Sequence, residues 1–345
     1  MPEISTVWFW LVALLLTAWA VLDGFDFGAG ILHRFVARTD SERREVLGAI
    51  GPVFDGNEVW LIAAGGSLYF AFPRLMAAAF SGFYLPMIFV VWALLLRGVS
   101  LELRSHVTNS LWRSFFDTTF GVSSFAVPLL MGALLGNLVR GVPLREDGYF
   151  ELGLFAAGGD LGVLDGYTFL CALLVLTTLA AHGANWLVWK TQGPMHQRVR
   201  SLRLPLWLGS CSLWLLTTFV TWRVAPDVIA RFPQRPLAWL GLVLVLGGLT
   251  TVFLKRKEEL APFAGGVAFI VGCLVMTAAC LFPVALRANE AALSLSVASA
   301  ATGASAMKGA LLWAGPGVLL AAGYLWWVLR HFRGKVTAAR DGEGY

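Results

Sequence analysis

The stretch Asp-Gly-Phe-Asp-Phe-Gly-Ala-Gly at residues 23–30 decides the fold of this chain, because it places two carboxyl groups inside a long apolar run. That run, residues 7–31, can cross a bilayer core, which needs roughly 20 apolar residues per helix. Asp23 and Asp26 are one turn apart and share one face of the expected helix. A charged group in such a helix costs about 2.5–3.5 kcal/mol, so these side chains need polar partners or a wet cavity.

The same stretch predicts close helix packing. Gly24 and Gly28 are four residues apart, and small residues at this spacing let the backbones of two membrane helices approach each other. We therefore expect a neighbouring helix to pack closely against the first one.

The composition of the whole chain agrees with a membrane protein. Of 345 residues, 58% are hydrophobic and 14% charged, about half the charge of a soluble domain. The apolar segments are continuous rather than alternating, which excludes an outer-membrane barrel. The formal charge of +5 is explained by basic loops at a membrane face, so we expect the lipid bilayer and no nucleic acid as a partner.

Hydropathy predicts an all-α polytopic fold with nine transmembrane helices in one integral membrane domain, residues 1–345. The second segment carries several polar residues, so a reentrant segment is its alternative. The nine predicted spans are 7–32, 46–70, 75–97, 114–139, 165–189, 204–222, 237–254, 262–283 and 309–329. We expect two four-helix bundles, within residues 1–139 and 165–283, and a peripheral ninth helix at 309–331.

The distribution of basic residues predicts the orientation. The loops that follow the odd-numbered helices hold 18 of the 26 Lys and Arg residues. Cytoplasmic loops carry such an excess, so the N-terminus is expected outside and the C-terminus in the cytoplasm.

A second acidic motif lies in the second predicted helix, residues 51–61. Asp55 and Glu58 are three residues apart there, and Asn57 lies between them. We expect Asp55 to be buried beside Glu58. Together with the first motif, the four carboxyl groups indicate a path for protons or cations that is entered from the cytoplasm. The alternative interpretation is that they pair with Arg34, Arg97 or the backbone and only fix the packing of the helices.

The chain offers little for ligating a cofactor. His182 is the only histidine well inside a predicted span, and a bis-histidine haem site needs two. The four cysteines lack the spacing of a metal site, so we expect neither haem ligands nor a metal on this chain. No motif of a soluble enzyme class is present in the sequence.

The order of these motifs resembles subunit II of the cytochrome bd-type quinol oxidases. The similarity is strongest over roughly the first 200 residues, and its motifs occur in order at 23–30, 39–44, 51–61, 78–84, 96–104, 136–143 and 182–193. Residues 163–168 are more similar to the cyanide-insensitive branch of the family. In one departure, residues 294–302 lack the acidic or amide residue that family members carry before the last helix.

The resemblance implies a heterodimer in the bacterial cytoplasmic (inner) membrane. The partner, subunit I, would carry two b-type haems and one d-type haem, oxidise quinol and reduce O2 to water. This chain would support assembly and deliver protons from the cytoplasm. Asp26 and Asp55 are then the relay candidates with Asp23 and Glu58, and Trp60, Arg97 and Asn57 support them. A small single-helix subunit and a bound quinone are further partners that the resemblance suggests.

Two rival functions follow from the same residues. Buried carboxyl groups on broken helices also serve proton- or cation-coupled secondary transporters. A purely structural subunit with inert carboxyl groups is the other alternative.

Overall fold

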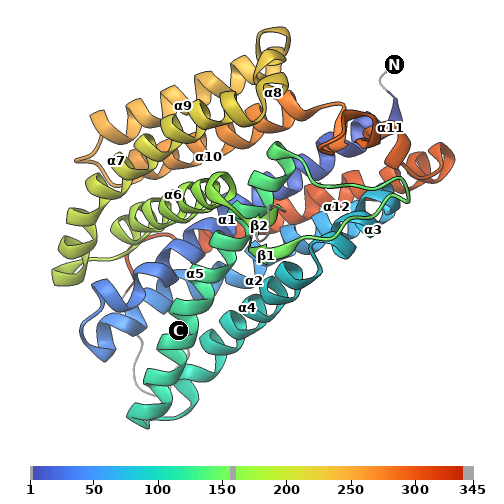
Figure 1. Cartoon of the computed structure of the whole chain (residues 1–345). Helices are drawn as coiled ribbons and strands as arrows, with labels where there is room; N and C mark the ends of the chain where they lie inside the picture. The colour runs from blue at the N-terminus through green and yellow to red at the C-terminus, as the bar shows by residue number, and fades with distance from the viewer. Residues whose placement is uncertain (1–2, 156–160, 337–345) are drawn as a thin grey trace.

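The computed structural model describes residues 3–155 and 161–336 as a bundle of long helices (Figure 1). The long helices are α1 (Ile4–Val36), α2 (Asp40–Ala71), α4 (Tyr84–Leu103), α5 (Ser110–Arg140), α6 (Gly166–Lys190), α7 (Gly193–Val224), α9 (Pro236–Leu254), α10 (Leu260–Leu281) and α12 (Ala304–His331). Within the described residues, eight helices are long and apolar enough to span a membrane, or nine if the bent pair α2 and α3 counts as one span. The predicted all-α membrane fold is therefore confirmed.

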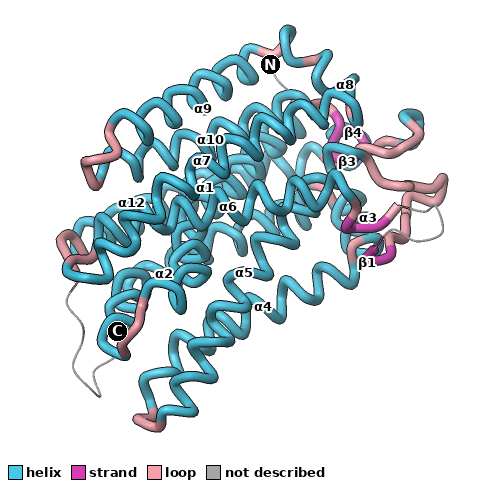
Figure 2. Tube along the Cα trace, turned by 60° about the vertical axis from the view of Figure 1, so that its left-hand side comes forward, coloured by secondary structure: helices cyan, strands magenta, loops and turns pink. Residues whose placement is uncertain are grey.

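The short elements gather at one end of the bundle (Figure 2). They are the helices α3 (Pro73–Gly82), α8 (Pro226–Ala230) and α11 (Val297–Ala300), and the strands β1 (Gly153–Phe155), β2 (Gly162–Leu164), β3 (Val284–Leu286) and β4 (Leu295–Ser296). Three 3-10 turns complete the described secondary structure, at Arg104–His106, Phe232–Gln234 and Ala291–Leu293. Strands β1 and β2 pair in parallel, with Gly153 opposite Gly162, and β3 pairs with β4 in antiparallel fashion.

The third predicted span, 75–97, is wrong at its beginning. Helix α3 is separate from the span that follows and is bent by 115° from α2, and the membrane-length helix begins only at Tyr84. Pro73 occupies the first turn of α3, where its missing N–H leaves no hydrogen bond unmade. Hydropathy missed the break because residues on both sides of it are apolar.

Local capping explains where several helices begin. Thr39 and Glu42 form a reciprocal capping box at the start of α2, in which each side chain accepts from the backbone N–H of the other residue. The Asp165 carboxylate caps α6 in the same way. Such caps satisfy backbone donors that have no partner within the helix.

Helices α1, α5 and α6 form the centre of the bundle. A Cβ added to Gly28 would lie 2.0 Å from the carbonyl oxygen of Leu179, and one added to Gly183 would lie 2.3 Å from Gly28. The close approach predicted for the glycine pair on α1 is thus confirmed, and the neighbour is α6. Helix α1 therefore joins the segment 1–139 to the segment 165–283, and the division into two four-helix bundles stays a prediction.

Candidate functional site

The candidate site is a group of polar side chains at the contact of α1, α2 and α4, which we call the acidic cluster: Asp23, Asp26, Asn57, Glu58 and Arg97. Asp23, Asp26, Asn57 and Arg97 are fully buried, whereas the side chain of Glu58 is 29% exposed. The two acidic motifs of the sequence are therefore brought together, with an arginine from a third helix between them.

Arg97 is the hub of the cluster. Its Nη2 atom donates to Asp23 Oδ1 at 2.5 Å and to Glu58 Oε1 at 2.8 Å. The guanidinium also stacks over the rings of Phe27 and Phe54, at 4.0 and 4.6 Å from the ring centroids. Cation–π contacts of this kind stabilise a desolvated guanidinium. The arginine is thus held between apolar faces and two carboxyl groups.

Asp26 occupies the other end of the cluster. Its Oδ2 accepts a hydrogen bond from Asn57 Nδ2 at 2.8 Å, and the same amide donates to the carbonyl oxygen of Leu22 at 3.1 Å. The Oδ1 atom of Asp26 has no hydrogen-bond partner among the described residues. Asp26 is thus a buried carboxyl group with one oxygen free to exchange a proton.

The charges of the cluster do not balance. Asp23, Asp26 and Glu58 face a single guanidinium, that of Arg97. Fully ionised, the group would carry two uncompensated negative charges, at least one of them fully buried, which is strongly unfavourable in a low-dielectric interior. Such a group is most stable with protons on it, and this is the property that proton transfer requires.

Two of the residues predicted for the site, Asp55 and Trp60, lie outside the acidic cluster. Asp55 is exposed on the outer face of α2, so the expectation that it is buried beside Glu58 is wrong. The cause is the rotation of α2, which turns Asn57 and Trp60 inward. Trp60 is 6% exposed and belongs to an apolar cluster with Trp19 and Val90. Its contacts are those of packing, and its predicted supporting role at the site stays a prediction.

A second group of charges lies at the C-terminal end of α1, about two turns beyond Asp26, and the sequence did not single it out. We call it the Asp117 cluster: His33, Asp40, Arg43, Arg104 and Asp117. His33 Nε2 lies 2.7 Å from Asp117 Oδ1, and Arg104 Nε donates to the same oxygen at 2.6 Å. Arg43 donates to Asp117 Oδ2 at 3.1 Å. The sequence feature that could have indicated this cluster is Asp117 itself, an aspartate near the start of the predicted span 114–139.

The two buried histidines are both enclosed within the chain, each with an exposed fraction of 0%. His182 Nε2 lies 3.1 Å from the carbonyl oxygen of Val21, and its ring stacks on Phe263 at a centroid distance of 4.8 Å. A Cβ on Gly266 would lie 2.9 Å from His182 Nδ1, so helix α10 covers that nitrogen. His33 is engaged by Asp117. Across residues 3–155 and 161–336, no group of three His, Cys, Asp or Glu side chains is arranged to hold a metal.

Comparisons with known proteins give a consistent result. The family model for cytochrome bd terminal oxidase subunit II matches residues 4–332. Subunit 2 of the cytochrome bd-I ubiquinol oxidase of Escherichia coli K12 is 32% identical over 308 residues, 80% of each chain. Subunit 2 of the cytochrome bd ubiquinol oxidase of Bacillus subtilis is 30% identical over 312 residues, 89% of each chain.

A solved structure has the same fold. A chain of the bd oxidase from Geobacillus thermodenitrificans superimposes with a TM-score of 0.78 at 16% identity. The match covers 95% of this chain and 98% of that one.

Proposed function

Because this chain belongs to the family of cytochrome bd terminal oxidase subunit II, we propose that it passes protons toward a haem-bearing partner subunit and supports its assembly. It is a subunit of a quinol oxidase complex, an oxidoreductase in which subunit I carries the haems. Quinol and O2 are the substrates that we assign to the complex as a whole. Family membership does not favour the transporter alternative.

The observation that carries the proposal is the excess of buried carboxyl groups over cations in the acidic cluster. It extends from the buried Asp26, through Asp23 and Arg97, to the partly exposed Glu58. Asp55 lies one turn from Glu58, on the outer face of α2. This order of increasing exposure supports a route from the interior of the chain to the face of α2.

The partner is proposed to dock on α2 and α12. The face of α2 that carries Asp55 continues as an apolar stripe of Val59, Ile62 and Tyr69. The exposed fractions of these three side chains are 45–72%. Helix α12 lies beside α2, and its Trp313 is 82% exposed. A large exposed apolar face of this kind is typical of an interface with protein or lipid. The stripe ends at the carboxyl groups, so a partner docked there would receive their protons.

The proposed orientation places the N-terminus outside and the C-terminus in the cytoplasm of a bacterial inner membrane. It rests on the excess of Lys and Arg in the loops after α1, α4, α6, α9 and α12. The Asp117 cluster, at the loop between α4 and α5, would then face the cytoplasm. A bound quinone and a small single-helix subunit remain part of the proposal, supported by the family resemblance alone.

The proton role is tested with Asp26→Asn. Asparagine has nearly the same shape and can still accept from Asn57, but it cannot carry a proton. We expect turnover of the assembled oxidase to fall by about 100-fold or more, in the range of lost proton-transfer groups, while the haem spectrum stays normal. Turnover is measured as quinol-dependent O2 consumption per haem.

Matched variants separate the outcomes. Asp55→Asn should reduce turnover by a smaller factor, because water reaches an exposed position and can replace the lost carboxyl group. Asp147→Asn, on an exposed loop, should change nothing. Unchanged turnover in fully assembled Asp26→Asn oxidase would overturn the proton role, and loss of all haem would favour the purely structural alternative.

The docking face is tested separately with Ile62→Asn. Val243→Asn on α9 is the matched control, because Val243 is 64% exposed and Ile62 is 72% exposed. Both variants place the same polar group on a lipid-length helix, so they share any cost of membrane insertion. Only Ile62→Asn should reduce copurification of the haem-bearing chain. Equal loss in both variants would contradict docking on α2.

A further inference from the structure

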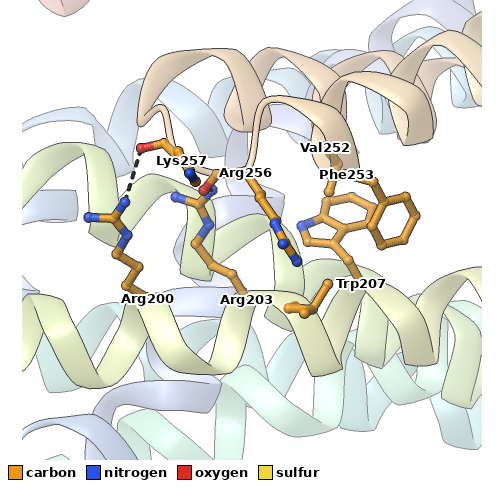
Figure 3. A pocket seen from close by; sticks show the side chains of 8 residues that line it. Arg200, Arg203, Trp207, Val252, Phe253, Arg256 and Lys257 are labelled. Carbon is orange, nitrogen blue, oxygen red and sulfur yellow. Dashed lines mark hydrogen bonds between the residues drawn. The ribbon is translucent and has the colours of Figure 1, made fainter.

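A basic pocket lies between α7 and the turn that joins α9 to α10, on other elements than the acidic cluster and the proposed docking face (Figure 3). Its volume is about 220 Å³, and it is lined by Arg200, Arg203, Leu204, Trp207, Val252, Phe253, Arg256 and Lys257. The four cations lie at its rim, and the apolar side chains continue toward the middle of the bundle. The pocket thus has one charged end and one apolar end.

Two of the arginines build the rim. Arg203 Nη2 donates to the carbonyl oxygen of Arg256 at 2.8 Å, and Arg200 Nη2 donates to that of Lys257 at 3.1 Å. These bonds hold the turn after α9 against α7. The side chains of Arg256 and Lys257 are exposed, and neither forms an ion pair within the described ranges 3–155 and 161–336. The adjacent carboxylates, Glu258 and Glu259, pair with Lys255 and Lys335 instead.

Trp207 supplies a second, independent observation. The residue is 1% exposed, and its indole Nε1 has no hydrogen-bond partner in the described part of the chain. The ring is held in place by Phe269, at a centroid distance of 5.6 Å, and by close contact with Gly266. Figure 3 shows the indole nitrogen facing the Arg256 side chain across the pocket. An indole N–H and a guanidinium are both donors only, so an acceptor belongs between them.

We propose that this pocket binds the phosphate of an anionic phospholipid, whose acyl chains lie along the outer faces of α7 and α9. A phosphodiester supplies the missing acceptor oxygens and the negative charge. Basic pockets between helices at a membrane face are known to recognise such headgroups. The pocket, with a volume of about 220 Å³, suits a headgroup but excludes a whole lipid. Leu208 and Leu246 are each about half exposed beyond it, which suits contact with acyl chains.

The test uses the purified oxidase complex after mild delipidation, with native mass spectrometry to count bound lipids. Phosphatidylglycerol, phosphatidylcholine of the same chain length, and inorganic phosphate are added in separate titrations. The wild-type complex should bind one phosphatidylglycerol in preference to phosphatidylcholine, and inorganic phosphate should not displace it. Displacement by inorganic phosphate at equal concentration would overturn the lipid assignment, and so would equal binding of the two lipids.

Single substitutions test whether the lipid binds in this pocket. Lys257→Gln should weaken binding about fivefold, the effect of one cation near a membrane surface. Lys255→Gln is the matched control, because it removes the same charge two residues away, outside the pocket. Trp207→Phe keeps the apolar wall and removes only the N–H, so binding should weaken by a smaller factor at unchanged haem content. Equal losses for Lys257→Gln and Lys255→Gln, or no effect of Trp207→Phe, would overturn the site.

Discussion

The acidic cluster and the Asp117 cluster are both partly carried by α1, yet their charges are arranged in opposite ways. Asp23 and Glu58 share the guanidinium of Arg97, and Asp26 beside them is bonded by the amide of Asn57. Asp117 and Asp40, in contrast, are contacted by Arg43, Arg104 and Arg113, with His33 as a further partner. A carboxylate surrounded by cations stays ionised and fixes geometry, whereas buried carboxyl groups in excess over cations favour a protonated form. The difference separates a structural anchor from a candidate proton carrier.

The strongest test of this comparison removes the only cation of the acidic cluster. Arg97→Met should destabilise the chain by about 3–5 kcal/mol, because breaking a buried ion pair leaves uncompensated charge behind. Thermal unfolding and the amount of haem-containing complex in membranes measure the loss. Arg34→Met, at an exposed position of α1, should have little effect. A stable Arg97→Met complex would contradict the role of Arg97 as the hub.

A smaller effect is expected in the Asp117 cluster. Asp117→Asn should cost about 2–3 kcal/mol, the magnitude of hydrogen bonds that involve charged groups. The complexes that do assemble should turn over normally, since Asp117 has no part in the proposed relay. The measurement is turnover per haem beside the unfolding temperature, with Asp147→Asn as the control. If turnover fell as far as in Asp26→Asn, the distinction between the two clusters would fail.

The smallest expected effect concerns the indole that supports Asp23. Trp19 Nε1 donates to Asp23 Oδ2 at 2.8 Å in the core of the chain. Trp19→Phe removes this donor and should lower stability by about 1–2 kcal/mol. Trp222→Phe, at a position 59% exposed, is the control in the same unfolding measurement. Equal stability of the two variants would mean that the hydrogen bond contributes nothing to the cluster.

The sequence motifs located the carboxyl groups of the site but did not predict which of them are exposed. Asp55, Asn57 and Glu58 lie within four positions of one another and point to different sides of the expected helix, so no amphipathic face marked which side of α2 turns inward. The contact of Asn57 with Asp26 settles that rotation, and it leaves Asp55 outside. The pairing of His33 with Asp117 spans 84 residues, and no local pattern encodes it.

The sequence by itself determined the all-α membrane class and the motifs of the family, because hydropathy and ordered motifs are local properties of the chain. Only the tertiary structure decided where α3 breaks from the following span, which carboxyl groups share Arg97, and that Trp207 lines a basic pocket. These features depend on how each helix is rotated and packed against its neighbours. An apolar helix carries little information about its rotation until polar groups from other helices select one face.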